Sequence, residues 1–163
     1  MANRWPQHGF TLMEALIASV VLSVTVVALS TAMMTGHMQN GYAMHAQRAN
    51  RLAEELLEYI CSLSYSDPHD GSLIGKSSTE KTRFLYDNIG DWQPYSDGPG
   101  GLTDMANVPY PDEYQEFRRD VTVWTETVAV PPLGNITGLW VKVTVTDKSG
   151  NSWAVQRFVP SPT

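Results

Sequence analysis

The hydrophobic and polar positions divide the chain into a long helical segment and a later strand-rich segment. Residues 10–34 are almost entirely apolar and contain one charged residue, Glu14. A helix over these residues would be about 38 Å long at 1.5 Å per residue, which exceeds the ~30 Å hydrocarbon core of a bilayer. The pattern therefore predicts a membrane-spanning helix near the N-terminus.

From residue 48 the pattern changes to that of an amphipathic helix, in which apolar side chains recur at steps of three and four residues. The apolar positions are Ala49, Leu52, Ala53, Leu56, Leu57, Ile60 and Leu63. We expect this stripe to be buried against a sheet formed later in the chain. Asp67-Pro68 predicts that the helix ends near Ser64. In the uncharged stretch before residue 48, Gly36 and Gly41 are positions where the helix could bend or loosen.

The last third of the chain has the alternation that is typical of β-strands. The expected strands cover residues 117–130, 139–146 and 153–159. Residues 147–151 have the composition of a hairpin loop. Residues 67–116 are rich in turn residues, so we expect loops there with one or two short elements around residues 82–86. Together these elements predict an α+β fold, with one long helix packed on a small three-stranded antiparallel sheet.

Charge is scarce and unevenly distributed. The chain has 163 residues, a net charge of -6, and 17% charged residues, against about 25% in an average soluble domain. No Asp, Glu, Lys or Arg occurs between Glu14 and Arg48, which argues against a single soluble globule. The absence of a Lys/Arg cluster disfavours nucleic acid as a partner. The single cysteine, Cys61, cannot form an intramolecular disulfide.

Two ordinary interpretations of the apolar segment leave Glu14 unexplained. A cleaved secretory signal has an apolar region of about 7 to 15 residues; this run is longer, although Ser30-Thr31-Ala32 resembles a cleavage site. A plain signal anchor fits the length, and Arg4 before the segment favours a cytoplasmic start. However, an acidic side chain in the hydrocarbon region costs about 2 to 3 kcal/mol and usually has a functional reason.

The residues Gly9-Phe10-Thr11-Leu12-Met13-Glu14 resemble the processing motif of the type IV pilin family, which includes pilus subunits and type II secretion pseudopilins. The resemblance implies that a prepilin peptidase cuts between Gly9 and Phe10 and methylates the new amine of Phe10. Glu14 would then be the fifth residue of the mature chain, the position of the family glutamate. In the family, the N-terminal amine of a neighbouring subunit is the proposed partner of this glutamate, and the pair sets the register of the filament.

The chemistry of Glu14 is consistent with this role. A carboxylate in apolar surroundings needs a cationic partner, and residues 15–47 provide none. The amine of Phe10 in the same chain or in a neighbour would supply the positive charge. The simpler alternative is that Glu14 extends to the lipid headgroups.

The resemblance implies a domain organisation of a leader (residues 1–9), a transmembrane or filament-core helix segment (10–34), an amphipathic helix segment (35–66) and a β-rich head (67–163). The implied protein is a non-enzymatic minor pilin or pseudopilin of a type IV pilus or a type II secretion pseudopilus. It would be held in the bacterial inner membrane with its head outside the cytoplasm before it joins a filament. Its partners would be prepilin peptidase and other pilins or pseudopilins.

Three further features bear on the choice of function. The single cysteine, the absence of a proline between residues 10 and 66, and the short β-rich head favour a minor component over a major pilin. A membrane-anchored binding module, whose head recognises an extracytoplasmic ligand without polymerising, remains the alternative. The sequence contains no catalytic signature, and the glycine-rich residues 71–77 are one residue too short for a phosphate-binding loop.

The head contains one candidate for metal binding. Asp87, Asp91 and Asp97 lie in an acidic loop, and calcium takes carboxylate oxygens from such loops. Some pseudopilins bind calcium. The spacing fits no EF-hand, so a solvated acidic loop without a cofactor is the favoured interpretation.

Overall fold

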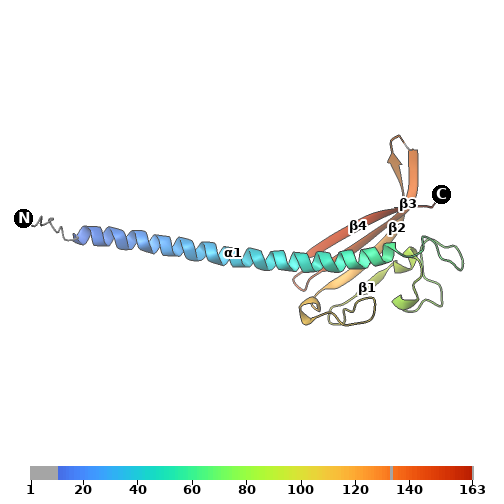
Figure 1. Ribbon diagram of the computed structural model, residues 1–163, viewed down its shortest axis with the longest axis horizontal. Coiled ribbons are helices and arrows are strands. Elements are labelled where there is room, and N and C mark those ends of the chain that lie inside the picture. The colour runs from blue at the N-terminus through green and yellow to red at the C-terminus, as the bar shows by residue number, and fades with distance from the viewer. Residues whose placement is uncertain (1–10, 133, 163) are drawn as a thin grey trace, which may run out of the picture. The chain divides into compact units, whose positions relative to one another are not determined.

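The computed structural model describes residues 11–132 and 134–162 (Figure 1). The chain divides into two compact units, Met1–Met44 and His45–Thr163. One helix, α1 (Leu12–Cys61), contains residues of both units and ends three residues before the expected boundary at Ser64. It is assigned as helix without interruption through Gly36 and Gly41.

The first segment of α1, residues 12–44, has no buried side chain. Its hydroxyl groups bond to carbonyls one turn earlier, as Ser23 does to Ser19 at 2.7 Å and Thr25 to Val21 at 2.7 Å. This pairing removes the need for water at those positions. By length and composition, α1 can cross a membrane.

The second unit contains a four-stranded antiparallel sheet with the strand order β1-β2-β3-β4 (Figure 1). Its strands are β1 (Tyr95–Asp97), β2 (Arg118–Val130), β3 (Gly134–Thr146) and β4 (Ser152–Pro160). The three expected strands are confirmed, and β3 begins five residues earlier than expected. The prediction of three strands was wrong by one, because β1 is too short to show a periodic pattern.

The core of the second unit lies between the second segment of α1, residues 45–61, and one face of the sheet. The helix contributes Ala49, Leu52, Ala53, Leu56, Leu57 and Ile60, all of them buried. From the sheet, β2 supplies Val121 and Val123, while β3 supplies Leu139, Val141, Val143 and Val145. These sheet positions alternate, as expected for strands with one buried face. The predicted packing of the helix stripe on a sheet, and with it the α+β fold, is confirmed.

The segment between α1 and β2 contributes to the core more than its loop-like composition indicates. It forms three short 3₁₀ helices, η1 (Arg83–Leu85), η2 (Ile89–Trp92) and η3 (Asp112–Tyr114). The first agrees with the expected element around residues 82–86. Trp92 is fully buried and meets Tyr86 and Tyr95 edge to face. The loop segment therefore closes one side of the core.

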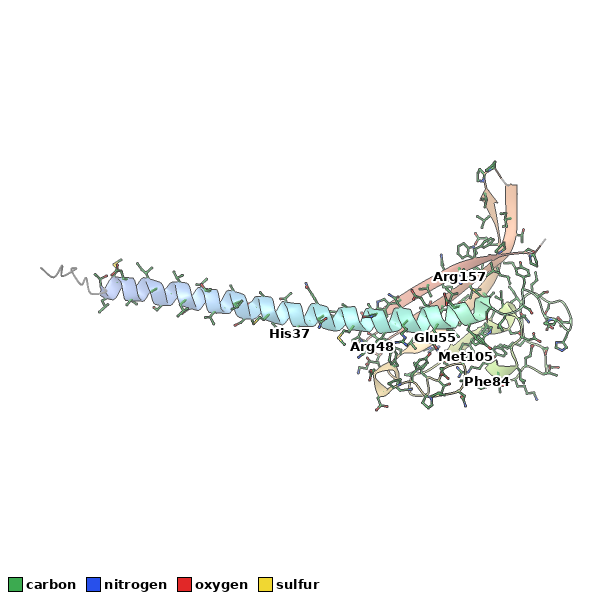
Figure 2. All side chains as sticks on the ribbon, in the orientation of Figure 1. His37, Arg48, Glu55, Phe84, Met105 and Arg157 are labelled. Carbon is green, nitrogen blue, oxygen red and sulfur yellow. The ribbon has the colours of Figure 1, made fainter. Side chains whose placement is uncertain are left out.

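Charged residues at the edge of the core connect α1 to the rest of the second unit (Figure 2). The guanidinium of Arg157 on β4 lies 3.7 Å from a carboxylate oxygen of Glu58. Arg48 lies 3.9 Å from Glu113 and faces the ring of Tyr114. Because the glutamate of each pair is exposed, each pair contributes about 0 to 1 kcal/mol.

The opposite face of the sheet carries an aromatic row across three strands. Trp124 of β2 stacks on Trp140 of β3 with ring centroids 6.1 Å apart, and Phe158 of β4 follows at 5.4 Å from Trp140. All three are half-buried, largely by one another and by the sheet. The strand tryptophans therefore lie on both faces of the sheet, since Trp153 packs against the core.

Candidate processing and assembly site

The site predicted from the sequence lies at the start of α1. Gly9 and Phe10, the predicted cleavage and methylation positions, lie outside the described residues. Thr11 and Glu14 are described. The structure therefore gives the geometry of the residues that immediately follow the predicted cut.

Thr11 and Glu14 form a capping box at the first turn of α1. The backbone N–H and the hydroxyl of Thr11 donate to the same Glu14 oxygen, Oε2, at 2.9 and 3.0 Å. In return, the backbone N–H of Glu14 donates to the Thr11 hydroxyl at 3.3 Å. This reciprocal arrangement satisfies two of the N–H groups that a helix start leaves without partners. The Thr-x-x-Glu spacing is present in the sequence and is the signal from which this capping box could have been predicted.

The capping box uses one oxygen of Glu14. The other oxygen, Oε1, accepts no hydrogen bond from a described residue, and the side chain is exposed. Glu14 therefore has an internal structural role and a second oxygen that is available for a cation from outside the helix.

In the head, Asp97 belongs to a buried ion-pair network. Its carboxylate accepts from Arg119 at 3.0 and 2.5 Å, and Arg83 lies 3.5 Å away. Arg119 is 1% exposed. Burial alone lowers the pKa of Arg119, but hydrogen bonding to Asp97 more than offsets this and raises it. Both Asp97 oxygens are engaged by arginine, which makes this candidate a poor calcium ligand.

Asp91, the second calcium candidate, caps η2. Its Oδ2 accepts the backbone N–H groups of Asp87 and Asn88 at 3.1 and 3.2 Å, and its Oδ1 accepts the Asn88 amide at 2.6 Å. Burial raises the pKa of Asp91, and the nearby Glu80 carboxylate adds to this effect, while the hydrogen bonds from Asn88 and Asp87 lower it. These hydrogen bonds from Asp87 and Asn88 therefore hold the Asp91 carboxylate in place.

The loop also brings together carboxylates that lie far apart in the sequence. One ligand atom each of Asp67, Glu80 and Asp91 lies within 4.8 Å of the others, and all three residues are buried. Asp87, the remaining calcium candidate, groups instead with Asp67 and His69. These are the described residues that could hold a cation. Asp67 and Glu80 are separated from Asp91 by 24 and 11 positions, so the sequence spacing gave no indication of this grouping.

Comparison with protein families finds a match near the N-terminus. Residues 6–30 match the family model described as the prokaryotic N-terminal methylation motif. No curated protein and no solved structure matches the chain.

A methylation motif at the start of a membrane-length helix defines a prepilin-type protein. With the helix packed on an antiparallel sheet, the chain has the N-terminal motif and the α+β fold that are typical of the type IV pilin and pseudopilin family. This family is structural rather than enzymatic, and the motif implies processing by prepilin peptidase. The motif and the apolar helix indicate a membrane-anchored pilin before assembly.

Proposed function

We propose that the protein is a minor pilin or pseudopilin, a structural subunit of a type IV pilus or of a type II secretion pseudopilus. The observation that carries the proposal is the methylation motif at the start of a helix whose first segment is exposed on all sides. An apolar surface of this kind must be covered by lipid or by protein. The inner membrane would cover it before assembly, and neighbouring helices would cover it in a filament.

Maturation would cut the chain between Gly9 and Phe10 and methylate the Phe10 amine. Thr11, the capping partner of Glu14, would then be the second residue of the mature chain. The capping box supports a defined helical start immediately after the cut. Glu14 Oε1 would remain available for the amine of a neighbouring subunit, and this ion pair would set the register between subunits.

The assignment to a minor component rests on the sequence features already given: one cysteine, no proline in the apolar helix segment, and a small head. The buried core and the ion-pair network of the head support a rigid unit displayed on the helix. The protein partners of that unit would be the adjacent subunits of the filament.

The test separates the charge of Glu14 from its capping role. Glu14→Gln keeps a carbonyl oxygen that can accept from Thr11 but removes the charge, whereas Glu14→Ala removes both. Thr11→Val weakens the capping box and leaves the charge in place, at a cost of about 1 kcal/mol to the first turn. The measurement is the fraction of processed protein found in sheared filaments or pseudopili rather than in the membrane.

We expect all three variants to be processed. Glu14→Gln and Glu14→Ala should both assemble poorly, while Thr11→Val should assemble nearly as well as the wild type. Normal assembly of Glu14→Gln would contradict the role of the charge. If no wild-type protein enters a filament, the membrane-anchored binding module becomes the better description.

A further inference from the structure

The start of α1 is fixed by side chains as well as by the backbone. α1 begins at Leu12, and the Ala15 N–H donates to the Thr11 carbonyl at 3.1 Å. Thr11 is therefore the N-cap, the residue immediately before the helix. Its hydroxyl accepts from the Glu14 N–H at 3.3 Å, and the Glu14 carboxylate accepts from the Thr11 N–H at 2.9 Å. The capping box therefore holds the start of the helix at one residue.

The predicted cut lies close to this helix start. Cleavage between Gly9 and Phe10 leaves one residue, Phe10, between the broken bond and the N-cap Thr11. The cut and the cap both lie within the segment that matches the methylation motif. A shift of the helix start toward the N-terminus would therefore reach the backbone at the cut within two residues.

A helical backbone is a poor substrate for a peptidase. In a helix, each carbonyl of the first turn accepts a hydrogen bond from an N–H one turn later. A protein that binds a peptide by its backbone needs these groups free, as they are in an extended chain. A peptide bond whose carbonyl is part of the helix would have to unwind before it could be cut.

Without the cap at Thr11, the helix has an alternative start at the cut itself. Glycine is among the residues that are favoured at an N-cap, and Gly9 is the nearest such residue before Thr11. In a helix capped by Gly9, the Gly9 carbonyl would accept the first intrahelical hydrogen bond, from the Met13 N–H. This carbonyl belongs to the bond that the peptidase has to break. The capping box at Thr11 therefore competes with a helix start that would occupy the carbonyl at the cut.

We propose that the capping box positions the Gly9–Phe10 bond for prepilin peptidase, by ending α1 at Thr11 and leaving the Gly9 carbonyl free. The reaction is a hydrolysis. The bond between the Gly9 carbonyl carbon and the Phe10 nitrogen breaks, the oxygen of a water molecule enters the Gly9 carboxylate, and the Phe10 amine takes up a proton. Thr11 is a positioning residue, because it acts through the start of the helix. This role rests on the proposed function, since it requires a cut at this bond.

Two substitutions at Thr11 separate the cap from the shape of the side chain. Thr11→Val keeps the branched shape and loses the hydroxyl that accepts from Glu14. Thr11→Asn changes the shape and keeps an N-cap residue that is at least as favourable as threonine. If the cap positions the bond, Thr11→Val should be cut less efficiently and Thr11→Asn should be cut like the wild type. Recognition of the threonine side chain by the peptidase would give the reverse order.

Two control variants lie on the same helix. Thr25→Val removes a hydroxyl that bonds to the Val21 carbonyl at 2.7 Å, well inside α1. Glu14→Gln removes the charge but keeps a carbonyl oxygen that can accept from the Thr11 N–H. Both variants should be cut like the wild type. Glu14→Gln and Thr11→Val should therefore differ in their defects, the first in assembly and the second in cleavage.

The measurement is the initial rate at which purified prepilin peptidase releases residues 1–9 from the full chain in detergent micelles, over a range of chain concentrations. When only a fraction of the chains can bind productively, the apparent affinity falls by that fraction. Loss of an N-cap shifts the equilibrium between helix starts by about fivefold. We therefore expect Thr11→Val to have a KM about fivefold higher than the wild type with an unchanged kcat. Given enough time, all variants should still be cut completely.

The results separate a failure of the cap from a failure of the proposed function. A wild-type KM for Thr11→Val would overturn the proposal, as would equal defects in Thr11→Val and Thr11→Asn or faster cleavage of Thr11→Val. An equal defect in Thr25→Val would assign the effect to the loss of any hydroxyl in α1 and would also overturn it. If the wild type itself is not cut between Gly9 and Phe10, the proposed function fails, and the role of the cap fails with it.

Discussion

The two segments of α1 are one helix adapted to different surroundings. In residues 12–44 every side chain is exposed, although nearly all of them are apolar or uncharged. In residues 45–61 the apolar side chains form a stripe, and six of them are buried. Arg51, Glu54, Glu55 and Glu58 are exposed on the other side. The second segment packs against the sheet of the same chain, whereas the first must be covered by lipid or by another molecule.

The two segments of this one helix therefore have different structural roles. The second segment specifies the fold of the head, because its stripe matches one face of a sheet. The first segment contributes nothing to that core and is free to meet lipid or other helices. The same substitution should therefore lower the stability of the head in the second segment and impair membrane insertion in the first.

The largest expected effect comes from placing a carboxylate on each segment. Leu56 is 1% exposed and Leu22 is 65% exposed. Leu56→Asp loses the burial of a leucine and buries an unpaired charge, which together cost more than about 5 kcal/mol and are enough to unfold a typical domain. Leu22→Asp should leave the unfolding of the head unchanged and should impair membrane insertion by about 3 kcal/mol. Tryptophan fluorescence during denaturant unfolding in micelles measures the first effect.

Two results would contradict this difference between the segments. If Leu22→Asp destabilised the head as much as Leu56→Asp, the first segment would be part of the same cooperative unit. If Leu56→Asp had no effect, the stripe would not form the core.

Buried and exposed charges in the head give the next comparison. Asp97 pairs with the buried Arg119, whereas Asp120 pairs with the exposed Arg118 two positions before it. Asp97→Ala leaves an uncompensated buried guanidinium and should cost about 3 to 5 kcal/mol. Asp120→Ala is the matched control and should cost at most about 1 kcal/mol. Equal free energies of unfolding for the two variants would contradict the assignment of Asp97 to a buried network.

The smallest expected effect concerns pH. Because burial raises the pKa of Asp91 in the folded head, the folded state holds this proton more tightly than the unfolded state. The contribution of the protonated carboxyl is fully present below the unfolded pKa, and it is lost as the pH rises through the folded pKa. The unfolding free energy of the wild type minus that of Asp91→Asn should therefore decrease as the pH rises through this range. An increase would show that the hydrogen bonds from Asn88 and Asp87 dominate over burial.

Calcium gives a related test of the same loop. We expect neither calcium nor a chelator to change the melting temperature, because Asp97 is bound to arginine and the loop spacing favours a solvated loop. A rise in melting temperature with calcium that is lost in Asp91→Asn would instead assign a cation to the buried carboxylates Asp67, Glu80 and Asp91.

Much of the fold could be predicted because its signals are local. The helix stripe and the alternation in β2, β3 and β4 follow from periods of 3.6 and 2, which a short window of sequence reveals. β1 has three residues and no period. Arg119 and Asp97 are 22 positions apart, and their pairing depends on the completed sheet. It therefore could not be predicted from the residues next to either one.

The site at the helix start was predictable in part. The motif around Glu14 stands out as the one charge in a long apolar run, and the resemblance to pilins followed from these residues. The capping box with Thr11 could also be predicted, because the Thr-x-x-Glu spacing is a local signal. β1 pairs with β2 only as far as Val121. This limit could not be predicted, because it depends on where the short strand β1 ends.

The most direct test of the proposed function is the mass of the mature protein, measured on cells with and without prepilin peptidase. We expect a chain that begins at Phe10 and carries one methyl group when the peptidase is present, and the uncut chain beginning at Met1 when it is absent. A mature chain that begins after Ala32, or one that still begins at Met1 in the presence of the peptidase, would show that the protein is not a processed prepilin.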